Sequence, residues 1–183
     1  GSYNTGIGRN ALGSVTTAEN NTAVGMNALY TNTASNNTAV GSEALVNNTT
    51  GTANVAVGKG ALDANTTASN NTAVGYDALG ANTTGTQNTA VGAYALDVTT
   101  TGGYNSAFGT NALGANTTAS YNTAIGNAAL YVNTTGTTNT ALGYQALTAN
   151  TTADNNTAIG NQTLASNTTG TKNVAVGGRS LYT

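Results

Sequence analysis

The five-residue motif Asn-Thr-Ala-Val-Gly recurs, with small variations, along the whole chain at nearly constant spacing. Its glycine defines a column of eleven residues: Gly8, Gly25, Gly41, Gly58, Gly75, Gly92, Gly109, Gly126, Gly143, Gly160 and Gly177. Neighbouring glycines are 17 residues apart, except for Gly25 and Gly41, which are 16 apart. A period this strict predicts a single repeat domain over residues 1–183, in which each unit contacts only its neighbours.

Two columns of large apolar residues predict the core. Counting from the column glycine, position −1 carries an aliphatic or aromatic residue in every unit, and position +4 carries Leu in every unit. Ala precedes both positions in nearly every unit, which indicates places where another backbone comes close. The predicted structural core includes Val24, Leu29, Val74, Leu79, Val91, Leu96, Ile125, Leu130, Ile159 and Leu164.

The composition of each unit predicts an all-β solenoid. β-Branched Thr and Val, turn-forming Asn and at least one Gly occur within 17 residues, which disfavours helix, and helical repeats need about 33 residues. Each unit is therefore predicted to form one coil, with short strands around Thr-Ala-Val and Ala-Leu and with corners at the Gly and at Asn-Thr-Thr. Eleven parallel coils with a rise of about 4.8 Å each predict a rod about 50 Å long.

Asn occupies position −4 in all eleven units. Asn tolerates left-handed backbone angles, and its amide both donates and accepts, so stacked copies at a corner are able to form a ladder. The ladder is predicted to include Asn71, Asn88, Asn105, Asn122, Asn139 and Asn156. A second Asn column lies at position +7.

Composition argues against several functions. The chain has no Cys, no His and only six Asp or Glu residues, so we expect no catalytic site, no metal site and no cofactor. A net charge of −2 lacks the basic stripe that a nucleic acid partner requires. No apolar run is long enough for this segment to insert into a membrane. The chain is therefore not expected to be an enzyme.

A lone rod is expected to be only marginally stable, because in each coil the burial of one Val and one Leu contributes less free energy than the ordering of 17 residues costs. Disulfides and metals, which commonly stabilise thin solenoids, are not expected in this composition. Side-by-side packing of identical rods is the remaining remedy. We therefore predict a parallel homo-oligomer in which the alanine columns approach the common axis.

Units such as Asn71–Gly75, Asn122–Gly126 and Asn156–Gly160, each followed by Ala-Leu or a close variant after two variable positions, resemble two known kinds of repeat. These are the head repeats of YadA-type trimeric autotransporter adhesins and the repeats of bacteriophage tail fibres. The resemblance covers all 183 residues. It implies a left-handed parallel β-roll, a homotrimer, and an extracellular place on a bacterial cell surface or a virion. The adhesin unit is typically shorter than 17 residues, and the extra length falls in the Asn-Thr-Thr corner.

The predicted function is a rigid structural module for attachment. Exposed tyrosines that break the pattern, Tyr30, Tyr76, Tyr131 and Tyr144, are candidate contacts for a host glycan or protein, or else simply cover apolar surface. Asp63 and Asp97, two coils apart, are expected to be solvated surface charges. One alternative function is ice binding: Thr recurs at positions +8 and +9, but only one of these adjacent columns is able to face outward, so Asn at +7 would have to supply the second column of the plane. Another is an extracellular filament that assembles by end-to-end stacking.

Overall fold

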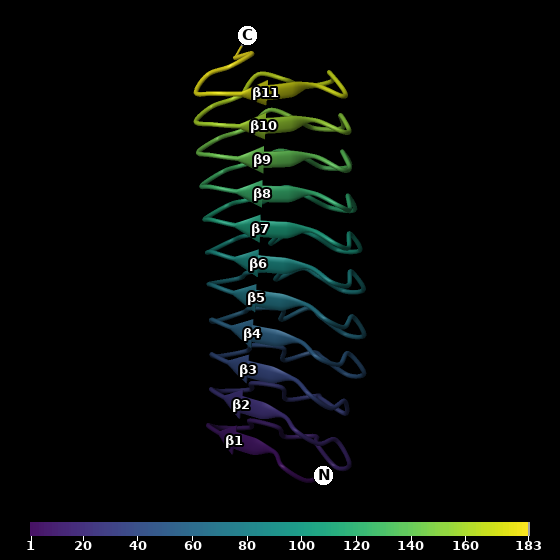
Figure 1. Cartoon of the computed structure of the whole chain (residues 1–183). Helices are drawn as coiled ribbons and strands as arrows, with labels where there is room; N and C mark the ends of the chain where they lie inside the picture. The colour runs from purple at the N-terminus through teal and green to yellow at the C-terminus, as the bar shows by residue number, and fades with distance from the viewer. Residues whose placement is uncertain (183) are drawn as a thin grey trace.

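The computed structural model describes residues 1–182 as an all-β rod, in which no helix is present (Figure 1). Its strands are β1 (Thr5–Ile7), β2 (Thr22–Val24), β3 (Thr38–Val40), β4 (Val55–Val57), β5 (Thr72–Val74), β6 (Thr89–Val91), β7 (Ser106–Phe108), β8 (Thr123–Ile125), β9 (Thr140–Leu142), β10 (Thr157–Ile159) and β11 (Val174–Val176). They form one sheet in chain order, and every pair of neighbours is parallel. The predicted β-solenoid is therefore confirmed, with about ten turns.

Strand pairing joins equivalent positions of neighbouring units. In the β5–β6 pair, Thr72 lies beside Thr89 and Ala73 beside Ala90. The pairing of β2 with β3 keeps the same order, with Ala23 beside Ala39, although this unit is one residue shorter. The missing residue is therefore absorbed by the loop between the strands, and the sheet continues without a shift.

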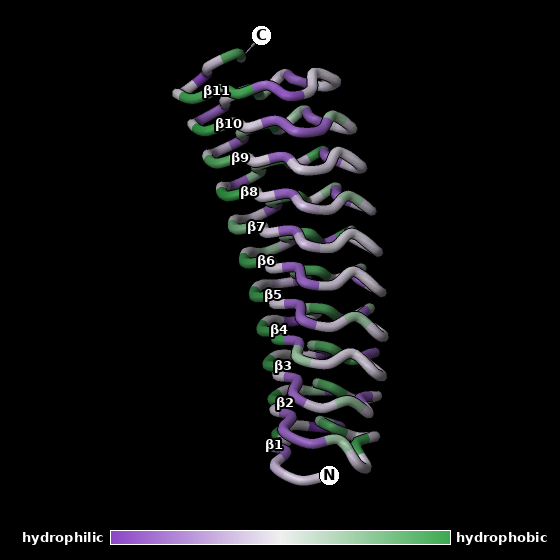
Figure 2. Tube along the Cα trace, turned by 45° about the vertical axis from the view of Figure 1, so that its right-hand side comes forward, coloured by the Kyte–Doolittle hydropathy of each residue, from purple (hydrophilic) through white to green (hydrophobic). Residues whose placement is uncertain are grey.

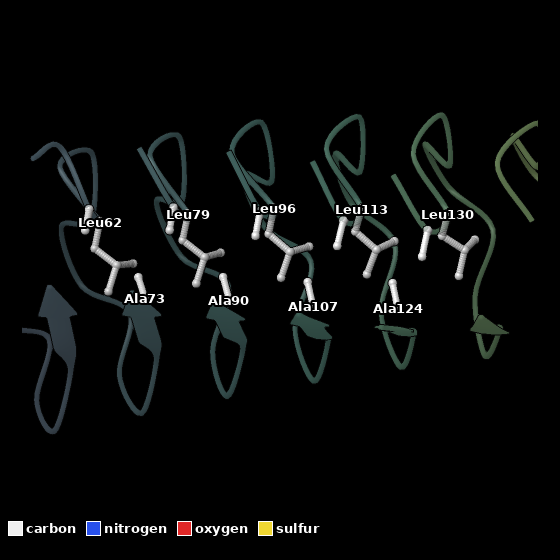
Figure 3. Packing of buried hydrophobic residues seen from close by; sticks show 14 of the residues in the cluster. Leu62, Ala73, Leu79, Ala90, Leu96, Ala107, Leu113, Ala124 and Leu130 are labelled. Atoms are coloured by element: carbon white, nitrogen blue, oxygen red, sulfur yellow. The ribbon is translucent and has the colours of Figure 1, made fainter. Parts of the chain in front are cut away.

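The interior of the rod is narrow and is filled by alanine and leucine. The Ala in the middle of each strand from β2 to β11 is buried, as are most residues at positions +3 and +4. Figure 3 shows Leu79, Leu96 and Leu113 on one wall, each pointing toward the Ala of a strand on the opposite wall. One Leu and two Ala per turn form the apolar part of the interior.

The aliphatic residue at position −1 lies outside this core, which corrects the sequence prediction. Val24, Val74 and Val91 are half-buried, and Ile125 and Ile159 are 40 % and 36 % exposed. Adjacent residues in a strand point to opposite faces, so a buried Ala at position −2 requires the next residue to point outward. The Leu residues of the predicted core are buried inside the rod: Leu29, Leu79, Leu96, Leu130 and Leu164.

The prediction that the alanine columns line an axis between copies is wrong. Ala90, Ala124 and Ala158 are fully buried within their own chain. The close backbone approach that alanine permits occurs between the two walls of one coil. Any contact between copies must therefore use other positions.

The Ala-Leu segment forms a turn, where a second strand was predicted. All eleven Leu residues at position +4 have left-handed backbone angles, with φ between 48° and 56°. This conformation costs free energy for a residue with a Cβ. It turns the chain back toward the sheet and directs the Leu side chain into the interior.

The column glycines are required by two independent features. Their φ values lie between 114° and 141°, where residues with a Cβ are strained. Each glycine also stacks directly on the next one: a Cβ on Gly126 would lie 2.5 Å from the carbonyl oxygen of Gly143. Position 0 is thus a corner at which neighbouring coils leave no room for a Cβ.

Candidate functional site

The Asn residues at position −4 form a continuous buried ladder. The backbone N–H of Asn88 donates to Oδ1 of Asn71 at 2.9 Å, and Nδ2 of Asn88 donates to the carbonyl oxygen of Gly102 at 2.8 Å. The same side chain to backbone link joins each predicted ladder residue to the next: Asn71, Asn88, Asn105, Asn122, Asn139 and Asn156. The predicted ladder is present, but most of its links join a side-chain amide to backbone groups.

The second Asn column, at position +7, forms the true amide-to-amide ladder. Nδ2 of Asn150 donates to Oδ1 of Asn133 at 3.0 Å and to the carbonyl oxygen of Ala153 at 3.0 Å. Both columns are buried through the middle of the rod. The buried Asn side chains of both columns therefore hold neighbouring coils together.

Thr99 interrupts the second ladder. It occupies position +7, where Asn82 precedes it and Asn116 follows it. Its hydroxyl donates to the carbonyl oxygen of Asn116 at 3.0 Å, but it is too short to reach back to Asn82. Oδ1 of Asn82 is consequently without a hydrogen-bond partner, alone among the buried side-chain nitrogen and oxygen atoms of residues 1–182.

Replacing Thr99 with Asn is expected to stabilise the rod. The new amide would donate to Oδ1 of Asn82, as Asn65 and Asn150 do to the preceding ladder residues. Satisfying a buried acceptor is worth about 1–2 kcal/mol of unfolding free energy. Urea denaturation measures the gain. Asn133→Thr creates a second interruption and should cost a similar amount; equal stability of all three proteins would contradict this account.

The four candidate tyrosines do not form one site. Tyr30 and Tyr131, at position +5, each lie over a glycine of the preceding coil, Gly13 and Gly114. Their rings fill the space that these glycines leave, so part of each ring covers the neighbouring coil. Tyr144, at position +1, is 47 % exposed. The rigid rod keeps positions +1 and +5 at separate places on its surface.

Two aromatic pairs lie elsewhere on the surface. Tyr76 makes an edge-to-face contact with Tyr94, with ring centroids 5.2 Å apart, and Nζ of Lys59 lies 5.8 Å from the ring centroid of Tyr76. Tyr104 and Tyr121, at position −5 of adjacent coils, stack with centroids 5.0 Å apart. The pairing of Tyr76 with Tyr94 was missed in the sequence because the two residues occupy different columns.

Asp63 and Asp97 are less solvated than the sequence analysis expected, since both side chains are half-buried. Burial raises the pKa of Asp63, and the nearby carboxylates of Asp77 and Glu43 raise it further. Burial also raises the pKa of Asp97, with a smaller contribution from Asp77. Both carboxyl groups are therefore harder to ionise in the folded rod than in the unfolded chain.

These shifts predict a pH dependence. A carboxyl group with a raised pKa binds its proton more tightly in the folded state, so its effect on stability becomes more favourable as the pH falls through that pKa. Asp63→Asn and Asp97→Asn should therefore raise the melting temperature at pH 7, and the gain should shrink as the pH is lowered. Glu19→Gln, at an exposed position, is the control. A gain that does not change with pH would contradict the assignment.

The outward side chains of the sheet form an uncharged strip with one column of large apolar residues. We define the outer strand face as positions −3 and −1 of β1 to β11. Position −3 carries Thr, Val or Ser, and position −1 carries Val, Ile, Leu or Phe. None of the four Lys or Arg and six Asp or Glu residues lies on it. Figure 2 shows the apolar end of each strand stacked in a continuous column along the rod.

The Thr columns do not form the plane of two exposed polar columns that ice binding would need. At position +8, the hydroxyl of Thr83 donates to the carbonyl oxygen of Thr100 at 3.0 Å, and several other coils repeat this bond. Asn at position +7 is inside the rod, so it cannot share an ice-binding plane. The exposed hydroxyl column is position +9, which includes Thr84, Thr101 and Thr118.

Residues 1–182 enclose no pocket, and their carboxylates are not grouped as a metal site requires. Nothing in this part of the chain is a helix with the length and hydropathy to cross a membrane. Comparisons with protein-family models, curated proteins and solved structures found no match.

Proposed function

We propose that the chain is a rigid, non-enzymatic rod that serves attachment at a bacterial or phage surface, and that it works as a parallel homotrimer. The observation that carries the proposal is the uncharged outer strand face, which runs the length of a uniform stack of coils. A shaft needs the same contacts in every coil. A receptor site needs a local exception instead.

The outer strand face has the properties of a contact between copies. Large aliphatic side chains such as Ile125 and Leu142 are 40 % and 42 % exposed on it, and no charge opposes their burial. At a rise of about 4.8 Å per coil and about 3.3 Å per residue, it measures about 50 Å by 10 Å. Exposed apolar patches of several hundred Å² commonly mark interaction sites.

The trimer places this face, in place of the alanine columns, around the common axis. The same positions recur at every level, so parallel copies meet with like strands side by side. Left-handed winding of each coil belongs to the same proposal and rests on the resemblance to adhesin heads and tail fibres. Contacts with a host glycan or protein would then use the outward turns, where Tyr30, Tyr76, Tyr131 and Tyr144 lie.

Ile125→Glu is expected to separate the trimer into folded monomers. Residue 125 points outward, so Glu is tolerated by a single rod, but three copies would bury three like charges at one level. Analytical ultracentrifugation and circular dichroism measure assembly and folding. Thr118→Glu, at an exposed position off this face, should leave the trimer intact. A stable, folded wild-type monomer at micromolar concentration would overturn the trimer.

The attachment role is tested on the same protein with a glycan array beside a thermal hysteresis assay. Binding to surface glycans that is lost on substitution of exposed tyrosines would support it. Ice shaping that is lost when Thr84, Thr101 and Thr118 are replaced would favour ice binding instead.

A further inference from the structure

An outer strand face that is the same in every coil does not define the axial register between two copies of the chain. If every coil of the outer strand face were the same, two copies would be able to slip past each other by one coil, about 4.8 Å, and lose contact at only one level of the stack. Sheets with flat, repetitive faces specify their register weakly for this reason. An assembly with a single alignment requires at least one level that differs from the others.

Strand β7 is that level. Phe108 is the only aromatic residue at position −1, and it is 39 % exposed on the outer strand face. The same strand carries Ser106, the only Ser at position −3, where the other strands have Thr or Val. The largest residue of one column and the smallest residue of the other thus occur in one strand, on the same face.

The neighbouring strands lack this combination. In the sheet, Ser106 pairs with Thr89 of β6 and Thr123 of β8, and Phe108 pairs with Val91 and Ile125. Both Thr residues carry a methyl group that Ser lacks. A copy displaced by one coil would therefore place its Phe108 beside Thr in place of Ser, where the additional methyl group overpacks the contact.

We infer that Ser106 and Phe108 set the axial register between copies of this chain. The inference rests on the proposed assembly through the outer strand face, and it commits to a second copy of the chain as the partner. In the aligned assembly, Phe108 of each copy lies at the level where its partners offer the small Ser106. The other strands supply adhesion without specifying alignment.

The test uses cysteine cross-linking, because the chain has no Cys and each introduced thiol is unique. Chains with Thr89→Cys are folded together with chains that carry Thr72→Cys, Thr89→Cys or Thr123→Cys, all at position −3. A disulfide needs Cα atoms about 4.4–6.8 Å apart, so the yield of each pair reports the level at which copies meet. Mass-tagged chains identify the pairs.

The decisive variant is Ser106→Thr/Phe108→Val, which turns β7 into the Thr-Ala-Val strand of β5 and so retains a strand that this fold accepts. In the parent sequence we expect cross-links between two Thr89→Cys chains, which report the same level, to dominate. In the variant, the cross-links from Thr89→Cys to Thr72→Cys, which report a displacement by one coil, and to Thr123→Cys, which report a displacement by two coils, should rise several-fold. Leu142→Val is the matched control, since it also creates a Thr-Ala-Val strand but should leave the pairing unchanged.

The outcomes separate this inference from the proposed function. An assembly of normal size whose cross-linked pairs are the same in parent and variant overturns the register role alone. An equal change in Leu142→Val also overturns it, because any loss of bulk would then suffice. A chain that sediments as a monomer overturns both the assembly and the register.

Discussion

The Ala124→Glu variant is expected not to form the rod. Ala124 is fully buried in the middle of β8, where its side chain faces the Leu column of the opposite wall (Figure 3). Glu adds both volume and a charge that has no partner there, which costs more than about 4 kcal/mol. Far-ultraviolet circular dichroism should show loss of the β signal, or the protein should accumulate as aggregates.

The adjacent Ile125→Glu variant tests whether the effect depends on the face of β8 to which the side chain points. It places the same side chain one residue later, on the opposite face of the strand, and should remain folded while losing association. If Ala124→Glu stayed folded as a dissociated chain, alanine would belong to the contact between copies, and the inward assignment of position −2 would be wrong.

The second large effect is expected from Gly126→Ala. A Cβ at this corner meets the backbone carbonyl oxygen and carbon of Gly143 at 2.5 and 2.6 Å, and the φ of 133° is strained for alanine. The atoms that the Cβ meets are backbone atoms of the next coil, which leaves little room for relaxation, so we expect a loss of more than about 3 kcal/mol of unfolding free energy. Thermal and urea denaturation measure it.

Gly177→Ala separates the two causes. Gly177 has a φ of 114°, but no atom lies within 4 Å of the position of its Cβ, since no coil stacks on it within residues 1–182. This variant should show only the conformational penalty. Equal losses at both positions would mean that close stacking of the glycines contributes nothing.

Much of the fold was predictable because a strict sequence period implies a repeated structural unit. Equivalent residues 17 apart must occupy equivalent environments, so one coil per unit and parallel pairing follow from the sequence. The Leu column was assigned to the interior, and the Asn ladder was identified by its ability to donate and accept. These features depend only on which residues recur, and recurrence is visible without a structure.

The direction of the strand residues was harder to predict. Val is more apolar than Ala, and hydrophobicity alone placed Val24 and Val74 inside. In a three-residue strand, however, Ala at −2 and Val at −1 must face opposite ways, and the narrow interior admits only the smaller one. The signal was available in the Ala column, whose close backbone approach lies within one coil.

The local exceptions escaped prediction for a different reason. The interruption at Thr99 matters only because Asn82 is left without a partner, and that depends on the reach of two side chains across one coil. Likewise, Tyr131 packs over Gly114, which occupies the same position +5 of the preceding coil, and this fit depends on how the ring lies across one coil. Such pairs become visible only when neighbouring coils are stacked.

The left-handed leucines have a consequence for how the rod assembles during folding. In each coil the Leu at position +4 has an unfavourable left-handed backbone conformation. Its side chain becomes buried only when another coil packs against it. A single coil in solution therefore has the strain without the compensation, and formation of the first stacked coils is the slow nucleation step. Once a stack exists, each added coil finds a template for its strand and both Asn ladders. Growth from a nucleus, one coil at a time, is the folding route that this architecture favours.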